Sequence, residues 1–209
     1  MNLRINFLTV VAILSWFALV AQFILLMQNR IAGINESIIR YFSYFTIEIN
    51  LLVAVCVTAQ LLKKPGKIAT FFLRPSVQTA ATLYITVVAI VYNIILRQLI
   101  SLDGFSRVVD ELLHLIIPIL IVIYWWKWVN THQLNWKIIP LWLLYPALYC
   151  LYILWRGSLS GFYPYPFMNV SKLGYNQVWI NCAGMIGVFL LFSLLLVLAG
   201  RKKNPGPLL

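Results

Sequence analysis

Six apolar stretches, each long enough to cross a lipid bilayer, constrain this chain more than any other feature. A helix needs about 20 predominantly apolar residues to cross the hydrocarbon core, where its backbone polar groups must bond to one another. Hydrophobic residues make up 62% of the chain and charged residues only 10%, whereas soluble domains average about 25% charged residues. The sequence therefore predicts an all-α integral membrane protein, folded over residues 1–209 as one six-transmembrane-helix bundle. The predicted spans cover residues 7–27, 42–62, 77–96, 112–129, 138–155 and 178–199.

The basic residues predict how the bundle is oriented, because cytoplasmic loops of membrane proteins carry an excess of Lys and Arg. Six spans that alternate in direction place ten of these residues on one side: Arg4, Lys63, Lys64, Lys67, Arg74, Lys127, Lys137, Arg201, Lys202 and Lys203. The other side holds six: Arg30, Arg40, Arg97, Arg107, Arg156 and Lys172. We therefore expect both termini to be cytoplasmic, in a multi-pass protein of a plasma or inner membrane.

Charge and cysteine patterns exclude several other classes of protein. The formal net charge is +11, but the basic residues lie singly or in short clusters between apolar spans, so no nucleic-acid partner is expected. The three cysteines, Cys56, Cys150 and Cys182, fall within apolar spans and lack the spacing of a metal site or a disulfide framework. Glu111 and His114 form one Glu-x-x-His motif of the kind that binds metal in carboxylate-bridged helical bundles, and Glu48 is a further candidate ligand. Such sites need two of these motifs, and the sequence has only one. We expect no metal and no cofactor.

The start of the second span is unusually polar. Residues 41–50 read Tyr-Phe-Ser-Tyr-Phe-Thr-Ile-Glu-Ile-Asn, and polar groups in hydrocarbon usually face a protein interior or a cavity. At 100° per residue, Ser43, Thr46 and Asn50 share one helix face, with Glu48 roughly opposite Thr46. The sequence predicts that this polar face is buried and contacts a polar side chain of another span. Glu48 would pair with a polar group of a different span or extend to the membrane–water interface.

The best partner for this face is His114 in the fourth span. Asp110 precedes His114 by four residues on the same helix face, where a carboxylate can fix the imidazole tautomer. Pro118 has no N–H, so the His114 carbonyl loses its usual helical partner. Thr46 and His114 each lie about four residues, or roughly 6 Å, below the outer surface. At equal depth they could form a nucleophile–base pair, with Asp110 as the orienting group; the structural alternative is a threonine bonded to a carbonyl one turn earlier.

Further polar residues reach a similar depth, while the cytoplasmic halves of the spans read as nearly pure apolar. We expect an oxyanion donor from Asn50, Asn93 or Asn181. The longest loop, residues 156–177, is rich in Gly, Pro and aromatic residues and is either a simple interfacial loop or a lid over a pocket. The substrate-binding candidates are Arg97, Arg156, Tyr163 and Tyr165.

Several of these segments, in the same order along nearly the whole chain, resemble one known family. It comprises the androgen-induced and androgen-dependent-TFPI-regulating membrane proteins with their bacterial Pr-six-Pr relatives. The matching segments are Phe42-Ser43-Tyr44-Phe45-Thr46 with Asn50, Asp110 to His114 with Pro118, Tyr145-Pro146, Tyr149 to Gly157, Tyr163-Pro164-Tyr165-Pro166-Phe167 and Gly174-Tyr175.

This resemblance implies an intramembrane threonine hydrolase of lipid esters. The animal members cleave fatty acid esters of hydroxy fatty acids, with a threonine early in span two and a histidine in span four. These roles fall here on Thr46 and His114, and imply two-step hydrolysis through an acyl-threonine. The expected partners are a lipid ester substrate and membrane lipids. The alternative is a transporter or lipid-binding protein without catalysis, in which Glu48, Asn50, Arg97 and His114 line a path.

Overall fold

The computed structural model describes residues 3–62, 66–132 and 134–202, so Lys63, Lys64 and Lys203 of the orientation argument lie outside it. The described part is helical and contains no strand. Six helical segments in it are long and apolar enough to cross a membrane: Leu3–Gln28, Phe45–Leu62, Pro75–Leu99, Gly104–Trp128, Trp136–Ser160 and Val170–Lys202. The predicted six-span all-α fold is therefore confirmed, while the membrane face on which the termini lie stays a prediction.

The spans are built from helices of different types. Three are single α-helices: α1 (Leu3–Gln28), α3 (Phe45–Leu62) and α9 (Val170–Lys202), the last bent at Gly174. The third span joins α5 (Pro75–Val91) to the π-helical turn η1 (Tyr92–Leu96) and the 3₁₀ turn η2 (Arg97–Leu99). The fourth joins α6 (Gly104–Glu111), the π-helical turn η3 (Leu112–Ile116) and α7 (Ile117–Trp128), and the fifth joins η4 (Trp136–Ile138) to α8 (Ile139–Ser160).

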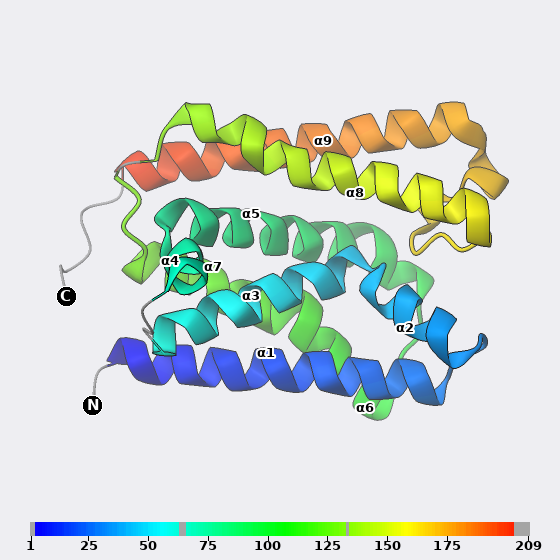
Figure 1. Ribbon diagram of the computed structural model, residues 1–209, viewed down its shortest axis with the longest axis horizontal. Helices are drawn as coiled ribbons and strands as arrows, with labels where there is room; N and C mark the ends of the chain where they lie inside the picture. Colours follow the sequence, from blue (N-terminus) through cyan, green and yellow to red (C-terminus); the bar gives the residue numbers. More distant parts are fainter. Residues whose placement is uncertain (1–2, 63–65, 133, 203–209) are drawn as a thin grey trace.

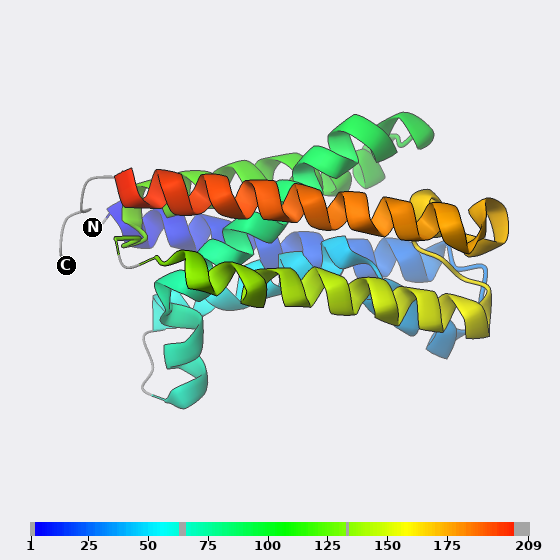
Figure 2. The same ribbon diagram turned by 90° about the horizontal axis from the view of Figure 1, so that it is seen from above.

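The helices form an elongated bundle in which α1 begins and α9 ends at the same end (Figure 1). Helix α3 packs against α1 and α5, α5 also packs against α7 and α9, and α8 packs against α9. Seen from above, α5 crosses the bundle obliquely, and the short helix α4 (Lys67–Leu73) projects away from it (Figure 2). The α3–α5–α7 contact is therefore the centre of the molecule.

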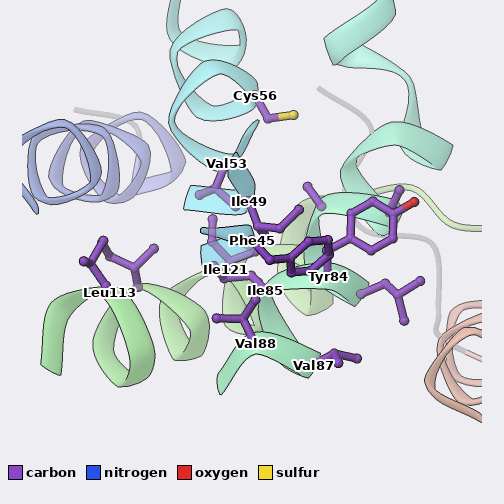
Figure 3. Packing of buried hydrophobic residues seen from close by; sticks show 14 of the residues in the cluster. Phe45, Ile49, Val53, Cys56, Tyr84, Ile85, Val87, Val88, Leu113 and Ile121 are labelled. Carbon is purple, nitrogen blue, oxygen red and sulfur yellow. The ribbon is translucent and has the colours of Figure 1, made fainter. Parts of the chain in front are cut away.

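Close packing holds this centre together, since lipid chains are as apolar as the helix surfaces and the hydrophobic effect contributes little to helix association. Phe45 and Ile49 of α3 lie against Tyr84 and Ile85 of α5 (Figure 3). Along α1 the buried residues are mostly small, namely Ala12, Ser15, Ala18 and Ala21, together with Leu8, Val11 and Leu19. Small side chains let two helix backbones approach closely, which explains the long contact between α1 and α3.

The predicted loops contain helices that the sequence analysis did not anticipate. The second span begins at Phe45 rather than Phe42, because α2 (Ile34–Phe42) ends just before it. The Ser43 side chain closes α2 by donating to the Ile39 carbonyl (2.7 Å), and the Tyr149 hydroxyl donates to the Ser43 carbonyl (2.9 Å). Ser43 therefore does not share a helix with Thr46, and the prediction of one continuous face from Ser43 to Asn50 is wrong.

A polar cluster lies at the end of the bundle where α1 begins. Arg4 donates to Gln60 (2.8 Å) and to the Tyr124 hydroxyl (3.3 Å), and Tyr124 donates to Gln78 (3.1 Å). Nearby, Trp125 donates to Thr79 (2.9 Å). The expectation that these halves of the spans are nearly pure apolar is therefore wrong, because their polar groups satisfy one another inside the bundle.

Candidate active site

The break between α2 and α3 gives Thr46 a special position. Thr46 is the second residue of α3, and the first N–H groups of a helix have no acceptor within it. The Thr46 N–H instead donates to the Tyr165 hydroxyl oxygen, at 3.3 Å. Thr46 as a whole is only 8% exposed, so it is largely shielded from solvent.

His114 lies in the π-helical turn η3, opposite a second π-helical turn, η1. Pro118 leaves the His114 carbonyl without its usual donor, and the Asn93 side chain supplies one at 3.0 Å. The same Asn93 amide donates to the Ala89 carbonyl one turn earlier (2.8 Å), a side-chain bond that competes with the regular helical pattern. Asn93 therefore joins the two irregular turns and fixes the backbone of His114.

The imidazole of His114 is held on one edge and one face. Its Nδ1 lies 2.9 Å from the Asp110 carboxylate and 3.0 Å from the Asp110 backbone carbonyl. The Tyr92 ring stacks on it, with centroids 3.5 Å apart and planes within 10°. Two acceptors at Nδ1 favour the neutral tautomer that carries its proton there, which leaves the Nε2 lone pair available as a base.

One cavity of about 530 Å³ brings these groups together. Its lining includes Thr46, Asp110, His114 and Tyr165, contributed by α3, α6, η3 and the segment before α9. A second, apolar hollow of about 60 Å³ lies among α5, α8 and α9. The two spaces share four lining residues: Thr46, Tyr92, Leu96 and Tyr165. Thr46 therefore lies where the larger cavity, which includes some polar side chains, meets the small apolar hollow.

The segment that carries Tyr165 is rigidly held. Prolines 164 and 166 flank Tyr165, its ring stacks on Phe167 with centroids 5.4 Å apart and planes within 5°, and η5 (Pro166–Met168) follows. Asn181 of α9 donates to the Phe167 carbonyl at 2.8 Å. Burial raises the pKa of Tyr165 to about 12, so its hydroxyl keeps its proton throughout the neutral range.

The three asparagines predicted as oxyanion donors point their amides at backbone carbonyls in this structure. Asn50 donates to Thr46 (2.9 Å) and Leu113 (3.4 Å), and Asn93 and Asn181 make the bonds described above. None of the three is among the residues that line the two spaces. Their observed contacts position the backbone around Thr46, His114 and Tyr165.

Three of the four substrate-binding candidates lie outside both spaces. Arg97 forms an ion pair with Glu111, and the buried Arg156 donates to Glu36 at 2.8 Å. The Tyr163 ring packs so closely on Gly157 that a Cβ there would lie 2.0 Å from it. Only Tyr165 of this group lines the cavity.

Sequence reasoning missed two features of the site. Tyr92 was not predicted to contact His114. Its position directly before Asn93, an aromatic residue near the predicted depth of His114, could have indicated this contact. Glu48 had no assigned partner, and it accepts a hydrogen bond from Tyr145 of α8 at 2.6 Å. Both contacts join different spans, which the spacing within one span does not reveal.

Within the described residues no group of three or more His, Cys, Asp or Glu side chains could hold a metal ion. Comparisons of the chain with models of known protein families, with curated proteins and with solved structures find no match. Function is therefore argued from the site.

Proposed function

We propose that the protein is an intramembrane lipid ester hydrolase with Thr46 as nucleophile and His114 as general base. The observation that carries the proposal is that both side chains line the same cavity, although 68 positions of sequence separate them. The Asp110 carboxylate and the Tyr92 ring orient the imidazole, as expected of a base that is held by a third group.

The chemistry proceeds in two steps. The Thr46 hydroxyl oxygen attacks the ester carbonyl carbon while Nε2 of His114 takes the hydroxyl proton. The tetrahedral adduct collapses, the imidazolium gives the proton to the departing alcohol, and an acyl-threonine ester remains. Water then attacks this ester with His114 again as base, and Thr46 regains a proton as the fatty acid departs. This transfer requires the Thr46 hydroxyl and Nε2 of His114 to lie within hydrogen-bond reach or to be joined by one water molecule when substrate is bound.

The two spaces suggest how an ester would lie. The apolar hollow is lined by groups such as Val87, Val88, Met185 and Phe189, and would take hydrocarbon next to the carbonyl. The larger cavity also has polar lining groups, including Gln22, Asn29 and Ser106, and would take the departing alcohol. The carbonyl carbon then lies at the junction, beside Thr46.

Labelling with a fluorophosphonate tests the proposal, because this probe phosphorylates activated hydroxyl nucleophiles. Membranes that contain the wild-type protein, Thr46→Ala or His114→Ala are treated with the probe, and ester turnover is measured in parallel. We expect Thr46→Ala to abolish labelling and His114→Ala to slow turnover by about 10²–10⁴-fold. Thr46→Ser should remain labelled, since it keeps a hydroxyl at the same place.

The chain offers matched controls for both variants. Thr58 lies on α3 as well, but its hydroxyl donates to the Ala54 carbonyl at 2.7 Å. His132 is exposed in the loop after α7. Thr58→Ala and His132→Ala should label like the wild type. Labelling of Thr46→Ala at the wild-type level would rule out the proposed nucleophile, and substrate flux into proteoliposomes without ester turnover would favour a transporter.

A further inference from the structure

Hydrolysis at Thr46 creates a negatively charged carbonyl oxygen that needs hydrogen-bond donors. Stabilising this oxyanion is often the largest single contribution to catalysis of acyl transfer. The amides of Asn50, Asn93 and Asn181 already donate to backbone carbonyls. The donors must therefore come from other groups beside the Thr46 hydroxyl. This inference rests on the proposed function.

Two groups have the required position. The N–H of Thr46 itself is outside the hydrogen-bond pattern of α3, as the second N–H of a helix is, and it points at the Tyr165 hydroxyl oxygen (3.3 Å). The Tyr165 hydroxyl also contacts the Thr46 hydroxyl. The nucleophile's own N–H is a known type of oxyanion donor in acyl transfer.

The distances allow both groups to bind one oxygen. An oxyanion lies about 2.8 Å from an amide nitrogen and about 2.6 Å from a hydroxyl oxygen when both donate to it. With the two donor atoms 3.3 Å apart, these lengths close a triangle. Two local changes are then needed. The Tyr165 O–H rotates so that it donates to the incoming oxygen, and the Thr46 N–H turns from the Tyr165 oxygen toward that oxygen.

We infer that Tyr165 is a catalytic residue whose hydroxyl, together with the Thr46 N–H, binds the oxyanion of the tetrahedral intermediate. Its ring is fixed by stacking on Phe167, and the Asn181 side chain anchors that segment to α9. Such preorganised donors lose little free energy to reorganisation when the charge forms. Tyr165 also lines the apolar hollow, where little water competes for the oxyanion.

Tyr165→Phe tests this role, because it removes the hydroxyl and keeps the ring that packs on Phe167. The substrates are 4-nitrophenyl decanoate and its thiono analogue, in which sulfur replaces the carbonyl oxygen and accepts hydrogen bonds poorly. We expect Tyr165→Phe to lower kcat for the oxygen ester by about 10²–10³-fold with little change in KM. The variant should lose much less activity on the thiono ester. The kcat for the oxygen ester divided by the kcat for the thiono ester should therefore fall by about tenfold or more.

The exposed Tyr175, near the start of α9, provides the matched control, and Tyr175→Phe should keep both rates and their ratio. A kcat for Tyr165→Phe within about threefold of the wild type would overturn the inference. An equal loss on both esters would also overturn it, because a purely structural defect affects both alike. If Thr46→Ala hydrolyses the oxygen ester as fast as the wild type, the proposed function itself fails, whatever Tyr165→Phe does.

Discussion

At the scale of single residues, His114 shows how one imidazole is prepared for proton transfer inside a membrane protein. Only 11% of its side chain is exposed, and 12% of the Asp110 side chain. Asp110 binds the Nδ1 edge, Tyr92 covers one ring face and Asn93 holds the backbone carbonyl. Each contact restrains a different degree of freedom, so the ring has one defined orientation toward the cavity.

The Asp110 contact leads to a prediction about the tautomer. Asp110→Asn puts an amide where the carboxylate accepts the Nδ1 proton, and an NH₂ group there would stabilise the tautomer with its lone pair on Nδ1. We expect kcat to fall by at least about 100-fold with KM nearly unchanged. Steady-state kinetics on a soluble fatty acid ester measure both constants.

Asp103→Asn is the matched control, since Asp103 is exposed and its side chain makes no capping bond at the start of α6. This variant should behave like the wild type. If Asp110→Asn keeps a kcat within about threefold of the wild type, the carboxylate does not orient the base.

At the scale of elements, an ionic and aromatic cluster joins α2, α8 and the segment before η5. Glu36 of α2 accepts from Arg40 and from Arg156 of α8, both at 2.8 Å. The Phe162 ring lies against both guanidinium groups, 4.4 Å from Arg40 and 5.0 Å from Arg156. Phe162 precedes Tyr165 by three residues, so this cluster helps to hold the segment that reaches Thr46.

The cluster predicts a pH dependence of stability. The hydrogen bond from Arg40, followed by that from Arg156, holds the pKa of Glu36 below its ordinary value. A carboxylate with a lowered folded-state pKa stabilises the fold above the unfolded-state pKa of about 4.3, and this contribution is lost as the pH falls through the folded-state value. The Tm of the wild type should therefore fall more between pH 7 and pH 4 than that of Glu36→Gln.

The expected size is small, because the Glu36 side chain is 32% exposed and such pairs contribute about 1 kcal/mol or less, or roughly 2–4 °C in Tm for a chain of this length. Thermal scans in detergent at several pH values measure it. Parallel Tm curves for the wild type and Glu36→Gln would show that the ion pair contributes nothing to stability.

At the scale of the whole molecule, α1 begins and α9 ends at the same end of the bundle (Figure 1), and the site lies toward the other end. The distribution of Lys and Arg predicts that the ends of the chain face the cytoplasm. The cavity with Thr46 and His114 would then open near the outer surface, within reach of lipids of the outer leaflet.

Reporter fusions in a bacterial host test this orientation. Green fluorescent protein fluoresces after cytoplasmic folding, and alkaline phosphatase is active only after export. We expect fluorescence from a fusion after residue 202 and phosphatase activity from a fusion after residue 103, in the connection between the third and fourth spans. The reverse pattern would place the site on the cytoplasmic side.

The sequence alone determined the number of membrane-spanning segments. A backbone in lipid must satisfy its polar groups within a helix, and the fixed rise per residue converts a position in a span into a depth. Six segments follow directly, whatever the order in which the helices pack. An equal depth of four residues for Thr46 and His114 does not, because their spans begin at Phe45 and Gly104. That the His114 carbonyl lacks its usual backbone donor also follows from Pro118 alone.

Only the tertiary structure decided which polar groups face the cavity. At the break after Phe42, the Ser43 carbonyl accepts a hydrogen bond from Tyr149, 106 positions further along the chain, and the contact of Tyr165 with Thr46 spans 119 positions. The amides of Asn50 and Asn93 donate both to a carbonyl one turn earlier and to a carbonyl of a neighbouring helical turn, and Asn181 donates to the Phe167 carbonyl. These hydrogen-bond partners depend on how the helices pack, and residue spacing within one segment does not predict that packing.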